Sequence, residues 1–189
     1  MQKPRGAYHH GDLRQALVDG AMSMVESSEP DQISLAAIAR QLGVSQAAPY
    51  RHFPDRDSLL SEVAAIGFED FRKRLEAAAA GKRGREAVLA RCAAYLDYGI
   101  SRPGLYRLMF ASRLLALQTK RGKLRSEALQ NFRHLVGLVE AAGHKTPDRQ
   151  AMKIWLSLHG MVMLSIYGLL DANPARLRKQ QLLELVSEI

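Results

Sequence analysis

Residues 34–53 read SLAAIARQLGVSQAAPYRHF and have the layout of a helix-turn-helix. Ser34 can cap a first helix, Gly43 can take the positive φ that ends it, and Ser45 can cap a second helix. Val44 is expected to be buried in the angle between the two helices. The exposed side chains of the second helix can then enter a DNA major groove, although a helical hairpin of any α-protein can share this pattern.

The sequence on both sides of this stretch also has helical periodicity. Apolar residues recur three and four positions apart, and no convincing run alternates with period two. We therefore predict an all-α fold of about nine helices. Besides the helix at 34–42 and the helix that begins at Ser45, helices are expected at 12–25 with Asp12 as the cap, 55–80, 88–99, 105–117, 124–139, 154–170 and 174–189.

The composition is that of an ordinary globular protein. Of the 189 residues, 47% are hydrophobic and 24% are charged, which excludes the collagen-like, disordered and disulfide-scaffold classes. The single cysteine, Cys92, cannot form an internal disulfide, and its apolar helical face favours a buried structural thiol over a nucleophile. The N-terminus has no apolar signal segment, so a cytoplasmic location is expected.

Residues 154–170, IWLSLHGMVMLSIYGLL, carry no fixed charge. A membrane-spanning helix needs about 20 predominantly apolar residues. This run contains Ser157, His159 and Ser165, and no second span accompanies it. We therefore expect no membrane partner and predict a helix that is buried by its own chain and by a partner chain.

The residues that flank the motif carry a more specific signal. Residues 38–60, IARQLGVSQAAPYRHFPDRDSLL, together with YHHGDLRQAL at 8–17, resemble the DNA-binding domain of TetR-family transcriptional regulators. The family pattern has a Tyr and a Phe at the end of the recognition helix, followed by a cation and a Leu-Leu pair. In this sequence these residues are Tyr50, Phe53, Arg56, Leu59 and Leu60.

The sequence departs from that pattern at two points. Arg56 stands where Lys is usual, which keeps a cation for a phosphate. Ala48 and Pro49 stand where the family often has a pair such as Thr-Leu. Proline is tolerated in the first turn of a helix, but it discourages helical geometry at the residue before it. We therefore expect an unusually short or tightened recognition helix.

The C-terminal half is similar to a TetR subgroup whose dimerisation helix carries a Trp and a His-Gly pair, through PGLYRLMF at 103–110 and WLSLHG at 155–160. The resemblance implies a DNA-binding domain at 9–70, with its motif at 34–53, and an effector-binding and dimerisation domain at 71–189. It also implies a homodimer formed through the last two helices, which binds operator DNA and is most commonly a repressor released by a small molecule. A constitutive DNA-binding protein without a ligand and, less favoured, a helical enzyme are the alternatives.

Base edges carry the sequence of DNA, whereas phosphate contacts fix the register of the protein on it. At the start of the recognition helix, the residues that can point outward are Ser45, Gln46, Ala47 and Arg51. Gln46 can pair with adenine, Ala47 can contact a thymine methyl group, and Arg51 can bind guanine or a phosphate.

A second group of residues is expected to contact phosphates. Tyr50 and His52 occupy positions that suit phosphates in the family pattern, although His52 can also be a plain surface histidine. The remaining candidates are Ser34 and Arg56 at helix N-termini, which favour anions, and Lys3 and Arg5 in the N-terminal arm.

The C-terminal half holds aromatic and methionine residues that suit an adaptable apolar cavity. Each of them is more often plain core than ligand contact, but the resemblance implies a cavity among the fifth to eighth helices. His159 has no partner visible in the sequence, so a pocket role and a core role both stay open. The expected lining residues are Phe68, Tyr95, Tyr98, Tyr106, Met109, Phe110, Trp155, His159 and Met163.

No group of residues has the spacing of a catalytic or metal site, and we expect no catalytic residue, cofactor or metal. His9 and His10 are adjacent, so they point in different directions on a helix and make a poor chelate. An arm or loop role suits this pair better.

The net charge of +8 suits polyanions such as nucleic acid, but its location decides what it means. Residues 1–60 hold six Lys and Arg against seven Asp and Glu, so the predicted DNA-binding domain is not net basic. Residues 102–134 hold eight Lys and Arg and one acid, Glu127. This segment can add long-range attraction to DNA, or it can favour an anionic effector.

Overall fold

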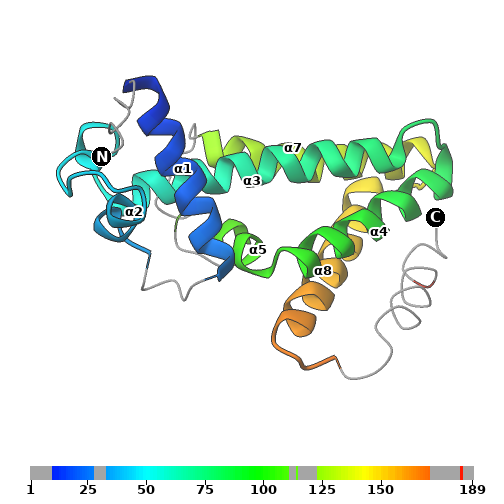
Figure 1. Ribbon diagram of the computed structural model, residues 1–189. Helices are drawn as coiled ribbons and strands as arrows, with labels where there is room; N and C mark the ends of the chain where they lie inside the picture. Colours follow the sequence, from blue (N-terminus) through cyan, green and yellow to red (C-terminus); the bar gives the residue numbers. More distant parts are fainter. Residues whose placement is uncertain (1–9, 28–32, 111–113, 115–122, 171–183, 185–189) are drawn as a thin grey trace.

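The part of the chain that the structure describes forms seven α-helices and one short 3-10 helix, without a β-strand (Figure 1). The computed structural model describes residues 10–27, 33–110, 114, 123–170 and 184. The all-α prediction is confirmed, although fewer helices are described than predicted. The elements are α1 (His10–Ser27), α2 (Leu35–Gln41), η2 (Pro49–Arg51), α3 (Arg56–Ala79), α4 (Gly84–Ser101), α5 (Pro103–Phe110), α7 (Lys123–Ala141) and α8 (Pro147–Ile166).

Two helix starts differ from the prediction. α1 begins at His10, so Asp12 lies inside the helix rather than at its N-cap. α8 begins at Pro147 rather than at Ile154. The polar residues before the uncharged run also form helical turns. The helix expected at 174–189 and the second half of the one expected at 105–117 fall, apart from Leu114 and Glu184, outside the described residues.

Side-chain caps begin α2 and α3 where the sequence predicts these helices. The Ser34 hydroxyl oxygen accepts from the N–H of Ala37 at 3.0 Å, and the Asp55 carboxylate accepts from the N–H of Ser58 at 2.7 Å. Hydrogen bonds from the side chain and the N–H of Ser58 lower the pKa of Asp55. Each cap satisfies a donor that the helix itself leaves unpaired and so stabilises the start of the helix.

α3 is the longest described helix and connects the two ends of the molecule (Figure 1). α1 and α2 gather around its beginning, α7 runs alongside it, and α4 and α8 lie toward its far end. One hydrophobic core extends from Leu17 of α1 through Phe68 of α3 to Val162 of α8. The predicted domain boundary between residues 70 and 71 falls inside α3, which crosses it without a break.

α8 is apolar on more than its core-facing side. Ile154 and Leu158 are buried in the core, whereas Leu156 and Leu164 are exposed. None of the described helices is long and apolar enough to cross a membrane.

Candidate functional site

The turn after α2 has the geometry that a helix-turn-helix requires. Gly43 has a φ of 68°, which is the left-handed conformation expected from the sequence. Its N–H donates to the carbonyl of Arg40 at 3.2 Å, and the N–H of Val44 donates to the carbonyl of Ala39 at 3.0 Å. This pair of bonds is a Schellman motif, which ends the helix and turns the chain. Val44 is half-buried rather than buried as predicted, because the segment it precedes is not a full α-helix.

Residues 45–52 form successive tight turns instead of an α-helix. The N–H of Ala48 donates to Ser45 at 3.0 Å, and the N–H of His52 donates to Pro49 at 2.9 Å. The predicted short, tightened segment is confirmed, but the predicted α-helix capped by Ser45 is wrong. Because Pro49 has no N–H, the carbonyl of Ser45 cannot receive the first α-helical bond and takes the N–H of Ala48 instead.

Most candidates for DNA contact lie on the outside of this segment. Tyr50 is 57% exposed, and His52 is half-buried. Phe53 is buried, and the guanidinium of Arg14 lies 5.0 Å from the centre of its ring. Arg14 also pairs with Glu62, so α1 and α3 hold the end of the segment in place. The exposed candidates are Ser45, Gln46, Ala47, Tyr50 and Arg51.

Ser34 and Arg56 lie at the beginnings of α2 and α3. Besides capping α2, Ser34 is half-buried, and Arg56 donates from Nε to the carbonyl of Ile33 at 2.6 Å. Arg56 Nη1 also lies 3.4 Å from a carboxylate oxygen of Asp57. Arg56 therefore braces the starts of α2 and α3 against each other. The sequence does not reveal this role, because Arg56 and Ile33 are far apart in the chain. The arm residues Lys3 and Arg5 lie outside the described residues.

A second feature is an apolar cavity of about 330 Å³ at the far end of α3. Tyr95, Phe110 and Trp155 of the predicted set line it, whereas the other six predicted residues do not. Phe68, Tyr98, Tyr106 and Met109 are buried in the core, and Met163 and His159 are half-buried. The lining residues are Phe71, Leu75, Arg91, Cys92, Tyr95, Phe110, Ala128, Leu129, Asn131, Phe132, Leu135, Met152, Trp155 and Leu158.

Arg91 and Asn131 are the lining residues that sequence reasoning missed most clearly. Arg91 lies on the same helical face as Val88 and Tyr95, three residues before and four residues after it. That register is the signal that places Arg91 in the interior. Burial also raises the pKa of the neighbouring Cys92 thiol to about 12, which keeps it protonated and structural, as predicted.

A row of hydrogen-bonded rings lies beside the cavity. The hydroxyl groups of Tyr95 and Tyr106 are 2.8 Å apart, and the Tyr106 hydroxyl is 2.8 Å from Nδ1 of His159. Burial raises the pKa of both tyrosines and lowers the pKa of His159, so all three groups are neutral near pH 7. Tyr106 is therefore the partner of His159 that the sequence alone did not show.

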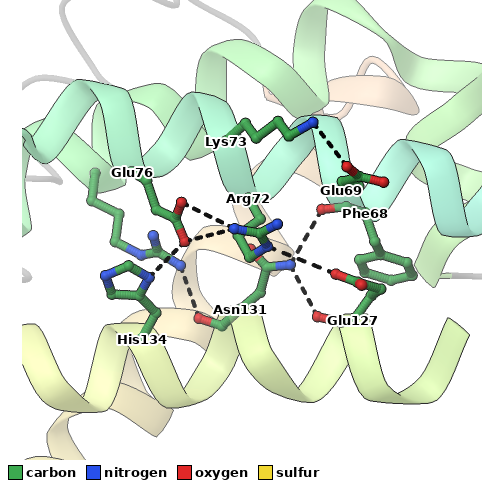
Figure 2. Close-up of polar contacts among 9 residues, drawn as sticks. Phe68, Glu69, Arg72, Lys73, Glu76, Glu127, Asn131 and His134 are labelled. Carbon is green, nitrogen blue, oxygen red and sulfur yellow. Dashed lines mark hydrogen bonds and ion pairs between the residues drawn. The ribbon is translucent and has the colours of Figure 1, made fainter. Parts of the chain in front are cut away.

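A polar cluster joins α3 to α7 (Figure 2). Arg72 donates to Glu76 at 3.1 Å and lies 3.7 Å from Glu127, while Nδ1 of His134 is 3.0 Å from Glu76. Burial by itself raises the pKa of Glu76, but Arg72 and His134 outweigh it and the net pKa is lowered. Asn131 donates from Nδ2 to the carbonyl of Glu127 at 3.1 Å. Glu76 is thus committed to Arg72 and His134, whereas Oε2 of Glu127 has no hydrogen-bond partner among the described residues.

Two family models match the chain. One, described as bacterial regulatory proteins of the tetR family, matches residues 17–63. The other, described as a tetracyclin repressor-like C-terminal domain, matches residues 88–186. Together they match both the helix-turn-helix region and the helices around the cavity.

Individual proteins are also similar to this chain. An uncharacterized HTH-type transcriptional regulator of Mycobacterium tuberculosis is 24% identical over 160 residues, covering 84% of this chain and 72% of that protein. The nucleoid occlusion factor SlmA of Aliivibrio fischeri is 31% identical over 140 residues, covering 71% of this chain and 66% of that protein. A protein of unknown function from Rhodococcus sp. RHA1 has a similar structure, with a TM-score of 0.84 and 27% identity over 97% of this chain and 98% of that chain. The chain belongs to the TetR family of DNA-binding transcriptional regulators.

Proposed function

We propose that the protein is a dimeric repressor that leaves its operator when a small apolar molecule fills the cavity. The single observation that carries this proposal is the course of α3. The helix begins at Arg56, beside α2 and the 45–52 segment, and its later turns supply Phe71 and Leu75 to the cavity wall. A change in the cavity is therefore connected to the DNA-facing residues by one continuous helix.

The proposed effect of the ligand follows from linkage. A ligand that binds more tightly to the arrangement with low DNA affinity lowers the affinity for the operator. Operator DNA then lowers the affinity for the ligand by the same factor. In a two-fold dimer the two 45–52 segments have to meet successive major grooves, about 34 Å apart, so a small tilt of α3 changes their fit.

The proposed dimer is supported by the outer face of α8. Leu156 is 60% exposed, and Met152 and Leu164 are exposed four residues before it and eight residues after it. Gly160 lies between them and a Cβ added there would meet nothing within 4 Å, so another helix can approach closely. An apolar stripe of this kind on a helix is typical of a surface that a partner covers.

The proposed DNA contacts divide between base reading and phosphate binding. Gln46, Ala47 and Arg51 are assigned to base edges, with a phosphate as the alternative for Arg51. Ser45 stays a candidate on the same exposed surface. Phosphate contacts are assigned to Ser34, Tyr50, His52 and Arg56.

DNA binding is tested on an operator selected from a random pool of duplexes and on a scrambled duplex. We expect Gln46→Ala to lose about 1–3 kcal/mol of preference for the operator and to bind scrambled DNA as before. Arg56→Gln should weaken both duplexes and reduce the salt dependence, because it removes a charge near the phosphates. Fluorescence anisotropy at several salt concentrations measures both effects. Lys82→Gln, in the α3–α4 connection, is the matched control because it also removes one positive charge. An equal loss on both duplexes for Gln46→Ala would rule out base reading by that residue.

Ligand release is tested with a neutral apolar dye, N-phenylnaphthylamine, whose fluorescence rises in apolar sites. We expect the dye to bind and to lower operator affinity, and Ala128→Phe, which fills the cavity from α7, to abolish both effects. A dye that binds without changing operator affinity, or that fails to bind, would favour a constitutive DNA-binding protein.

A further inference from the structure

Arg91 is a buried cation in the wall of an otherwise mostly apolar cavity. It lies in α4, is 3% exposed, and lines the cavity together with Phe71, Phe132 and Trp155. Its Nη2 donates to the carbonyl of Asn131 at 2.8 Å. Its Nη1 has no hydrogen-bond partner among the residues that the structure describes. The guanidinium is therefore only partly satisfied by the protein.

The nearby carboxylates do not neutralise this charge. Glu76 accepts from Arg72 and faces His134, and Glu127 lies against Arg72. Within the described ranges, neither carboxylate forms an ion pair with Arg91. Burial lowers the pKa of Arg91 to about 10 in spite of an electrostatic attraction to Glu76, and the group stays protonated near neutral pH. A buried guanidinium with no ion pair and an unpartnered Nη1 is unfavourable, so its presence in a cavity wall calls for an anion.

We propose that the effector is an amphipathic acid whose carboxylate pairs with Arg91 while its apolar body fills the cavity. This inference rests on the proposed ligand-controlled function and names the chemical class of the ligand. The aromatic and aliphatic wall accepts the apolar body, and the guanidinium offers a donor of the geometry that carboxylates bind. The unpaired Oδ1 of Asn131 is a neutral acceptor, so it contributes less to the choice of ligand than the charge of Arg91 does.

The test compares decanoate with decanol, which share an apolar chain and differ in the charged headgroup. Titration calorimetry near neutral pH should show decanoate binding about ten- to a hundredfold more tightly than decanol to the wild-type protein. Arg91→Met, which keeps the length of the side chain and removes the charge, should bind the two compounds equally. Arg83→Met, at the exposed start of the same helix, is the matched control and should keep the preference for the acid.

A folding control keeps the result interpretable. Without ligand, Arg91→Met should melt at or above the wild-type Tm, because it removes a buried charge that forms no ion pair. Arg91→Lys is the second variant, which keeps a cation without the planar fork, and it should retain a reduced preference for decanoate.

Three outcomes would overturn the inference. Equal binding of decanoate and decanol to the wild type would leave an apolar effector site and remove the role of Arg91. A preference for decanoate that survives in Arg91→Met would place the anion elsewhere. If neither compound binds the folded protein, the acid is not the ligand class. The dye and the Ala128→Phe variant then decide separately whether the cavity controls DNA binding.

Discussion

Single residues set the chemistry of the molecule's interior. Tyr106 is the middle of the row that runs from Tyr95 to His159, and its hydroxyl is 2.8 Å from a polar atom of each neighbour. Because every hydroxyl in this row has a partner, the row can be buried beside an apolar cavity without the desolvation cost of an unpaired polar group. His159 is the one member of the row whose ordinary pKa lies close to physiological pH.

His159 makes stability depend on pH in a definite direction. Burial lowers its pKa below the ordinary value of 6.5, so between the two values the unfolded chain binds a proton that the folded chain does not. The free energy of unfolding should therefore fall as the pH is lowered through 6.5, and should be unaffected by this group well above that pH. Urea unfolding of the wild type and of His159→Gln at pH values on both sides of 6.5 measures the dependence. The difference between the two proteins should change across this range, and a constant difference would contradict the assignment.

At the scale of elements, the contact between α1 and α5 joins the DNA-facing end to the rest of the molecule. The N–H of Gly104 donates to the Glu26 carboxylate at 3.1 Å. Arg102 pairs with Asp70 of α3 at 3.0 Å and lies 3.5 Å from Glu26. The end of α1, the middle of α3 and the start of α5 are thus linked through two acidic side chains, Glu26 and Asp70, and one arginine. This close approach depends on the absence of a side chain at residue 104.

Replacing that glycine should separate the two helices. A Cβ at Gly104 would overlap the carbonyl oxygen of Val25, and a backbone atom cannot rotate away as a side chain can. Gly104→Ala should lower the free energy of unfolding by about 1–3 kcal/mol, as overpacked sites do. Gly137→Ala in α7 is the control, because a Cβ there meets nothing within 4 Å, and it should be neutral or stabilising by up to about 1 kcal/mol. Denaturant unfolding compares them, and similar effects of both variants would argue against the tight α1–α5 contact.

At the scale of the whole molecule, two surfaces lie at opposite ends of a continuous core. The 45–52 segment lies at the beginning of α3, and α8 lies on the other side of the molecule, below the later turns of α3 (Figure 1). The exposed apolar face of α8 carries Met152, Leu156 and Leu164. Both surfaces rest on the same core cluster, but their exposed side chains are not part of it. A defect in the α8 face should therefore alter assembly and DNA binding without unfolding the chain.

Leu156→Glu tests this separation. A charge in the middle of the α8 stripe cannot be buried without a counter-ion, so the variant should be a monomer at concentrations where the wild type is a dimer. It should also lose most of its affinity for a two-half-site operator, because one subunit then binds one half-site. Analytical ultracentrifugation and DNA titration measure the two effects, and Ala77→Glu on the exposed side of α3 is the matched control. A dimeric Leu156→Glu protein would place the interface elsewhere.

Much of the fold is predictable because helical periodicity and caps are local properties. The caps Ser34 and Asp55 and the left-handed Gly43 require only the residues around them, and each is observed as predicted. Pro49 was correctly expected to tighten its segment. The predicted α-helix after Ser45 was wrong because the loss of one N–H removes the first bond of that helix altogether.

The cavity was less predictable because its wall comes from residues that are far apart in the chain. The aromatic and methionine residues suggested Tyr95, Phe110 and Trp155 as lining residues. They also suggested Phe68 and Met109, which fill the core instead. Nothing local distinguishes these two groups, since both share an apolar helical face. Arg91 was missed because arginine is almost always exposed, and only its register on α4 indicates burial.

The sequence by itself determined the all-α class, the helix-turn-helix, its capping residues and its shortened second element, because backbone hydrogen bonding and helix capping act over a few residues. Only the tertiary structure decided that Arg56 braces α2, that His159 pairs with Tyr106, and that Arg91, buried in a cavity wall, donates to the carbonyl of Asn131. These three contacts join residues that are distant in the chain, and their partners are fixed by how the helices pack rather than by any local pattern.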